Sequence, residues 1–187
     1  TVFLSLAWVL AGSPGEFADY SRAAAAFELP AGVVATHLAL ALLIPISFGL
    51  VAFVHHFSPK WLHSVQPGFR WRYGLAATLV AVVVLVGLWV FSRLGQPWVL
   101  APEPNIAWLL VAIILTSPLQ AAAEEYFFRG YLLQAIGSAG PVGPWFGVVG
   151  SAAVFALLHG AQDLPLFVHR FAFGLIAGAL VIKTGGL

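Results

Sequence analysis

The sequence has 187 residues, of which 8% are charged and 61% hydrophobic, and its formal net charge is +1. Soluble domains carry about 25% charged residues, so this composition predicts an integral membrane protein. The sequence has no cysteine, which excludes disulfides and thiolate metal sites, and it has no basic excess that would indicate nucleic-acid binding. No basic segment precedes the first apolar run, so we expect no cleavable signal peptide.

Apolar stretches separated by polar loops predict an all-α fold, a polytopic membrane helix bundle. Because each spanning helix needs about 20 residues, we expect about six spanning helices in the sequence. We expect Pro45 to kink the second stretch, and Pro118 lies near the middle of the fourth. The predicted stretches are 1–12 (the tail of a span), 31–57, 74–94, 106–136, 145–159 and 164–183.

The basic residues predict the orientation of the chain in a cell membrane. Lys60, Arg70 and Arg72 lie in the loop 58–73, which the positive-inside tendency places in the cytoplasm. Alternation of the spans then gives the remaining loops: 13–30, 95–105 and 160–163 outside, and 137–144 and Lys183 inside.

We treat residues 1–187 as a single membrane domain, with N-terminal spans in 1–105 and the motif-bearing helices in 106–187. The residues after Lys183 are typical of a helix end followed by the start of another segment, so we expect the chain to continue beyond Leu187.

Two adjacent carboxylates, Glu124 and Glu125, follow an uncharged run from 107 to 123. A charge at bilayer depth costs at least about 2.5–3.5 kcal/mol, so this pair requires an explanation. Glu125 and Arg129 are four residues apart, the spacing at which a helix lets a carboxylate and a guanidinium pair. Glu124 lies about 100° round the helix and remains free for another partner. The alternative is that the Glu125–Arg129 pair only holds a helix end at the membrane interface.

His159, one turn after Phe155, is the predicted partner of Glu124. If the chain forms an antiparallel hairpin that turns near residues 140 and 141, the two side chains are level, and packed helices are about 8–10 Å apart. Glu124 then acts as a general base on water, with His159 orienting that water or sharing its proton. The predicted reaction class is hydrolysis, and a lone histidine that only packs is the alternative.

The other histidines have simpler interpretations. We expect His37 to form a local hydrogen bond, and we rank His169 as the strongest competitor of His159 for a catalytic role. No His-Glu-x-x-His and no Gly-x-Ser-x-Gly motif occurs. The three histidines expected at the headgroup level beside the basic loop are His55, His56 and His63.

Together, Glu-Glu-x-x-x-Arg (Glu124, Glu125 and Arg129) and Phe-x-x-x-His (Phe155 and His159) resemble the motifs of the CPBP family. These are the CAAX-processing and bacteriocin-immunity (Abi) intramembrane proteases, related to the Rce1-type prenyl-protein endopeptidase. Gly130 after the arginine, and the helix with Gly174 and Gly178, also fit the family's pattern, although these glycines first indicate close helix packing. The similarity covers residues 106–187.

The resemblance implies a membrane endopeptidase that opens towards the cytoplasm and cleaves a peptide or protein substrate at the lipid bilayer. It implies that Glu124 activates water with His159, while Glu125 and Arg129 support the site. Family members carry a further histidine and asparagine on a later helix. This sequence stops before that helix, so the presence of these two residues stays open. No cofactor is certain, and a divalent metal is left open, although one histidine and two glutamates do not complete a zinc site.

Two other functions fit the sequence less well. A non-catalytic membrane scaffold or immunity partner would keep the helix hairpin without the chemistry. A proton-coupled carrier would need inverted internal repeats, and the sequence shows none. The sequence names neither the substrate, nor its prenylation, nor a protein partner.

Overall fold

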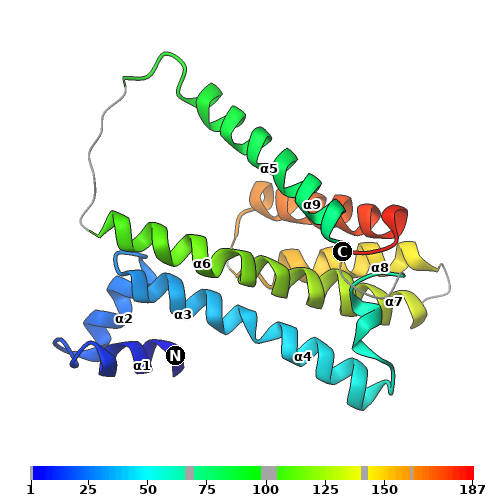
Figure 1. The fold of residues 1–187 in the computed structure, drawn as a ribbon, viewed down its shortest axis with the longest axis horizontal. Helices are drawn as coiled ribbons and strands as arrows, with labels where there is room; N and C mark the ends of the chain where they lie inside the picture. Colours follow the sequence, from blue (N-terminus) through cyan, green and yellow to red (C-terminus); the bar gives the residue numbers. More distant parts are fainter. Residues whose placement is uncertain (1, 66–69, 98–104, 140–142, 161) are drawn as a thin grey trace.

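A computed structural model describes residues 2–65, 70–97, 105–139, 143–160 and 162–187. Within these residues the fold is a bundle of helices, as predicted (Figure 1). Two elements are π-helices (η1 and η3) and one is a 3₁₀-helix (η2). The elements are α1 Val2–Leu10, α2 Phe17–Ala25, α3 Pro30–Ala41, α4 Leu43–Gly49, η1 Leu50–Val54, η2 Pro59–Leu62, α5 Trp71–Ser92, α6 Ile106–Glu124, η3 Glu125–Leu132, α7 Leu133–Ala139, α8 Pro144–Leu157 and α9 Leu164–Thr184.

Four continuous helical stretches in the described part are long and apolar enough to cross a membrane: Pro30–Val54, Trp71–Ser92, Ile106–Ala139 and Leu164–Thr184. The protein is an integral membrane protein. A fifth apolar helix, Pro144–Leu157, is shorter. All six predicted apolar stretches are helical, and the first of them, α1, is the short piece that the sequence suggested.

The second span loses its regular α-helical pattern near the predicted kink. The change is at Leu42, between α3 and α4, three residues before Pro45, within an otherwise continuous helical stretch. A proline has no N–H to donate to the carbonyl one turn earlier and its ring crowds that carbonyl, so the regular helix breaks there.

Small residues let the helices approach closely. A Cβ added to Gly174 on α9 would lie 2.8 Å from the Ala152 Cβ on α8, and one added to Gly178 would lie 3.1 Å from Val148. Gly147 on α8 sits so close to Leu133 of α7 that a methyl group there would overlap the Leu133 carbonyl. The packing role predicted for the glycines of α9 therefore agrees with the structure.

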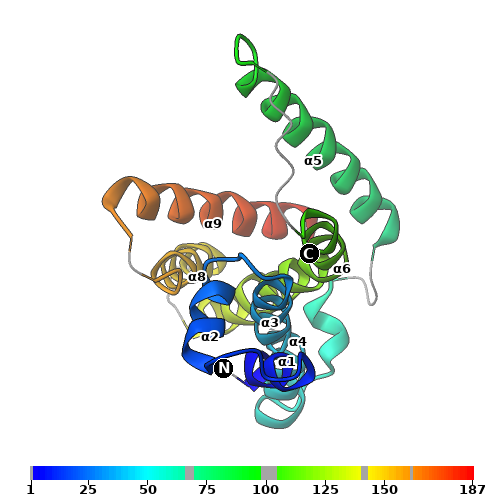
Figure 2. The same cartoon turned by 90° about the vertical axis from the view of Figure 1, so that its left-hand side faces the viewer.

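Helix α5 differs from the rest of the bundle. None of its residues is buried, and Figures 1 and 2 show it projecting away from the other helices. By contrast, α3 packs along α6, and α8 packs between α7 and α9 (Figure 2).

The loop after η1, the end of α7 and the end of α9 lie at one end of the bundle. The sequence predicts that all three lie on the same side of the membrane. The backbone of Val65 donates to Gly185 (2.9 Å), and the backbone of Leu187 donates to His63 (2.9 Å). Residues of η2 also lie beside α7, with which they share a cavity. The predicted turn at 137–144 falls partly outside the described residues, at 140–142. That this end faces the cytoplasm stays a prediction.

Candidate active site

The two glutamates of the motif lie at a change in helix geometry. Glu124 ends the regular helix α6, and the π-helix η3 begins at Glu125 and includes Arg129. A π-helix has wider turns than an α-helix, and such segments occur frequently at functional sites. The sequence did not predict this feature.

Arg129 is enclosed, with only 2% of its side chain exposed. Its Nη1 lies 3.1 Å from Oε1 of Glu125, which confirms the predicted ion pair. The guanidinium also lies 4.5 Å from the ring centre of Phe155 and 5.4 Å from that of Phe173, within the range of cation–π attraction. The guanidinium therefore fastens η3 to α8 and α9.

Glu124 is half-buried and has a partner of its own. The side-chain amide of Gln120, one turn earlier on α6, donates a hydrogen bond of 2.7 Å to Oε1 of Glu124. Hydrogen bonds to a charged acceptor are stronger than neutral ones, so this contact fixes the direction of the carboxylate. The second carboxylate oxygen has no hydrogen bond within the described residues. Sequence reasoning missed Gln120, although its position four residues before Glu124 was a usable signal.

The predicted hairpin has the register that brings Glu124 and His159 level. Phe128 of η3 packs edge-to-face on Phe155 of α8, with ring centres 5.1 Å apart. Glu124 precedes Phe128 by four residues and His159 follows Phe155 by four. Because the two helices are antiparallel, both residues lie one turn beyond this contact in the same direction. Across the described residues, however, no hydrogen bond or ion pair joins the two side chains.

His159 follows the end of α8, which is a short helix. Helix α8 has 14 residues and so measures about 21 Å, whereas the hydrocarbon core is about 30 Å thick. The ring of His159 is exposed in the part of the chain that the structure describes, and its depth in the membrane stays a prediction.

The tautomer of His159 follows from its one side-chain hydrogen bond. Nδ1 lies 2.6 Å from the carbonyl oxygen of Phe155, and a carbonyl only accepts, so Nδ1 carries the proton. Nε2 then keeps its lone pair and can accept a proton or a hydrogen bond. The ring also packs on Phe155, at 4.4 Å between centres.

Polar residues of α9 and the preceding loop surround the end of α8. The amide of Gln162 donates to the carbonyl of Ala156 (2.6 Å), and Arg170 donates to the amide oxygen of Gln162 (2.7 Å). Arg170 also lies 3.4 Å from the carbonyl oxygen of His159. His169, the predicted competitor, is exposed.

Two of the remaining histidines make tertiary contacts that the sequence did not predict. Nδ1 of His63 lies 2.5 Å from the hydroxyl of Tyr126. That this ring lies at the headgroup level stays a prediction. Nδ1 of His37 lies 2.7 Å from Oγ1 of Thr116 and joins α3 to α6, which is a long-range bond and not the local one expected.

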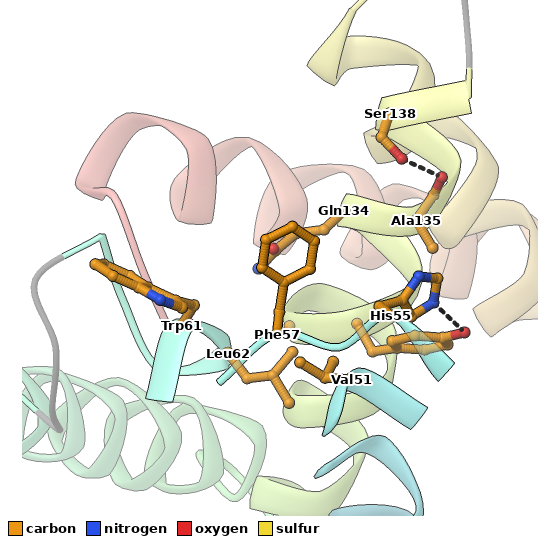
Figure 3. A pocket seen from close by; sticks show the side chains of 10 residues that line it. Val51, His55, Phe57, Trp61, Leu62, Gln134, Ala135 and Ser138 are labelled. Atoms are coloured by element: carbon orange, nitrogen blue, oxygen red, sulfur yellow. Dashed lines mark hydrogen bonds between the residues drawn. The ribbon is translucent and has the colours of Figure 1, made fainter. Parts of the chain in front are cut away.

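A cavity of about 530 Å³ lies beside the π-helix, at the end of the bundle where η2 meets α7 (Figure 3). Figure 3 shows Phe57, Trp61 and Leu62 facing Gln134 and Ala135 across it. His55 lies 3.4 Å from the hydroxyl of Tyr131, another lining residue. The side chains are mostly apolar or aromatic and none that lines the cavity is charged, which suits an apolar ligand.

The described side chains do not converge on a metal site. Across the described ranges, no group of three or more histidine, aspartate or glutamate side chains could hold a metal ion. Zinc in proteins is held by at least three such ligands.

Comparison with known proteins supports the family resemblance of the part of the chain that carries the motifs. The family model of the Rce1-like type II CAAX prenyl endopeptidases matches residues 106–187, from the start of α6 to the end of the sequence. This segment is therefore similar to the Rce1-like family. The match covers both motifs, from Glu124 to His159, and the resemblance that the sequence suggested is confirmed over it.

The chain also resembles an uncharacterized protein, YyaK, of Bacillus subtilis (strain 168), with 35% identity over 86 residues. That alignment covers 43% of this chain and 28% of YyaK, so the chain spans under a third of this relative. No solved structure matches the chain.

Proposed function

We propose that this protein is an intramembrane endopeptidase that hydrolyses a peptide bond in a membrane-associated substrate. The observation that carries the proposal is the register set by Phe128 and Phe155, which brings Glu124 and His159 to one level inside an Rce1-like segment. A carboxylate and an imidazole with a free nitrogen at one membrane depth are suited to activating water.

In this proposal Glu124 is the general base. Its free carboxylate oxygen takes a proton from water while the oxygen of that water attacks the carbonyl carbon of the substrate. Nε2 of His159 accepts a hydrogen bond from the same water and orients it. Glu124 then passes the proton to the leaving amine, so that the peptide bond breaks and both groups return to their starting state.

Glu125 and Arg129 support this site without touching the substrate. Their ion pair and the rings of Phe155 and Phe173 hold the π-helix against α8 and α9. The position of Glu124 relative to His159 depends on that packing, because Glu124 immediately precedes the π-helix.

The cavity and the family's name support a proposal for the substrate class. Rce1-like proteins are described as prenyl endopeptidases, and the cavity beside Gly130 and Tyr131 is apolar and free of charged lining residues. We propose that it receives the hydrocarbon chain of a lipid-modified substrate from the cytoplasmic side of the cell membrane. A site of this size is within the usual range for a drug-sized ligand.

The test uses the full-length protein in liposomes with a quenched farnesylated peptide that ends in Cys-aliphatic-aliphatic-X. Glu124→Ala and His159→Ala should each lower the cleavage rate by about 10²–10⁴-fold, the usual contribution of a general base. His169→Ala is the matched control, because His169 is exposed, and it should retain the wild-type rate.

The same peptide without its farnesyl group tests the role of the cavity. Ala135→Phe fills the cavity and should raise KM for the farnesylated peptide, while Ala139→Phe, at an exposed position near the end of the same helix, should not.

A substrate-independent measurement covers the case in which neither peptide is cleaved. Sequencing of protein termini in membranes of cells with wild-type or Glu124→Gln protein should reveal termini that require Glu124. If no terminus depends on Glu124, the protein is not an endopeptidase and the scaffold function is favoured. Full cleavage by both Glu124→Ala and His159→Ala would likewise reject the proposed mechanism.

A further inference from the structure

The carbonyl groups at the end of α8 need hydrogen-bond donors from outside the helix. The last four carbonyl groups of a helix have no partner inside it. Water or donors from elsewhere in the chain satisfy them, and in a hydrocarbon environment an unpaired carbonyl costs several kcal/mol. The segment that follows Leu157 and the neighbouring helix α9 can supply such donors.

Donors are present for the carbonyls around His159. The backbone of Leu158 donates to Val154 (3.0 Å), and Nδ1 of His159 donates to Phe155 (2.6 Å). The amide of Gln162 donates to the next carbonyl, that of Ala156 (2.6 Å). His159 is thus itself one of the groups that close the helix, so the direction of its ring depends on the closure.

Arg170 orients this arrangement from α9. Its Nη1 donates to Oε1 of Gln162 (2.7 Å), which turns the nitrogen of that amide towards α8, and it lies 3.4 Å from the carbonyl oxygen of His159. A guanidinium at this place also carries positive charge to the negative end of the α8 dipole. Arg170 and Gln162 are both half-buried.

We propose that Arg170 and Gln162 are positioning residues that cap α8 and thereby fix the ring of His159, with Nε2 free for the reaction. This role rests on the proposed hydrolysis, and neither residue touches the substrate. Without the hydrogen bonds of this cap, the residues after Leu157 form other hydrogen bonds. The ring of His159 then no longer has a fixed orientation. The carboxylate of Glu124 is unchanged, so the rate of hydrolysis falls only because the ring of His159 is misaligned.

The kinetic test uses the full-length protein with the farnesylated peptide. Gln162→Leu and Arg170→Leu should lower kcat by about 10- to 100-fold with little change in KM, because small misplacements of a catalytic group have effects of this size. Arg170→Lys keeps the charge and several donors, so it should recover most of kcat. His169→Leu, next to Arg170 on α9, is the matched control and should be silent.

A double mutant separates positioning from general stabilisation. If Arg170 acts through His159, Arg170→Leu should cause no further loss of rate in a protein that already carries His159→Ala. A merely structural role predicts additive losses. Additivity, or full kcat in Gln162→Leu, would overturn the proposal while wild-type cleavage continues to support the proposed function.

A spectroscopic measurement does not depend on cleavage. Nitrogen-15 NMR of labelled protein in liposomes should show His159 with its proton on Nδ1 in the wild type, and a mixture of tautomers in Gln162→Leu and Arg170→Leu. An unchanged, single tautomer in both variants contradicts the cap. If the wild type shows the cap but cleaves nothing, only the proposed function fails.

Discussion

Helix α5 and the hairpin formed by α6, η3, α7 and α8 are both apolar enough to enter a membrane, but the chain uses them differently. The mean hydropathy over an 18-residue window is 2.6 within Trp71–Ser92 and 1.9 within Ile106–Ala139. Helix α5 buries none of its residues, whereas the hairpin carries the buried Arg129. The more hydrophobic helix therefore contributes less to the packed core.

The difference lies in where polar groups find their partners. The hydroxyl of Thr78 on α5 bonds to a carbonyl of its own helix, at Gly74. In the hairpin, Arg129 reaches the rings of Phe155 and Phe173 on two other helices. In a membrane, hydrophobicity alone brings a segment into the bilayer, while polar contacts and close packing between helices decide which segments form a site.

The largest expected effect is on packing, and two glycines provide a matched pair. Gly147→Ala places a methyl group against the Leu133 carbonyl and 3.0 Å from Gly137, so it should destabilise the hairpin by about 1–3 kcal/mol or more. Gly87→Ala on α5 meets nothing within 4 Å and should leave stability unchanged or slightly raised. Thermal unfolding in detergent measures both. Equal Tm values for the two variants would show that α8 does not pack as described.

The second effect concerns the buried cation. Arg129→Lys keeps the charge but loses the flat group that lies against Phe155 and Phe173, so stability should fall by about 1–3 kcal/mol. Arg72→Lys, exposed at the start of α5, is the control and should change stability by less than about 0.5 kcal/mol. A Tm of Arg129→Lys equal to that of the control contradicts the enclosure of the guanidinium.

A smaller effect on stability, but a clear one on rate, is expected at Gln120. Gln120→Leu removes the donor to Oε1 of Glu124 and should lower kcat by about 10- to 100-fold with KM unchanged. Thr78→Val removes a polar group from α5 and should have no effect on the rate. An unchanged kcat in Gln120→Leu would mean that Glu124 needs no support from α6.

Much of this arrangement could be predicted from the sequence. Apolar runs give the helices, Pro45 gives the interruption at Leu42, and the spacing of Glu125 and Arg129 gives their ion pair. Glu124 and His159 are separated from the turn near residues 140 and 141 by about the same number of residues, and this count predicts that they are level in the hairpin. Each of these inferences uses only neighbours along one helix or a count along one hairpin.

The remaining features depend on contacts between distant segments. The π-helix at Glu125–Leu132 has no composition that distinguishes it from an α-helix. Pairing of His63 with Tyr126 depends on how the loop after η1 folds back over η3. The role of Arg170 depends on α8 ending where it does, and nothing in the local sequence of α9 shows this.

The most direct test of the central claim is cysteine crosslinking, since the sequence contains no cysteine of its own. A short bifunctional thiol reagent that reaches about 8–10 Å, the spacing of packed helix axes, should join Glu124→Cys to His159→Cys in the full-length protein. Glu124→Cys paired with Trp145→Cys, which lies at the other end of α8, should remain unlinked. No crosslink between positions 124 and 159 in folded protein, or a crosslink between 124 and 145, would contradict a shared site.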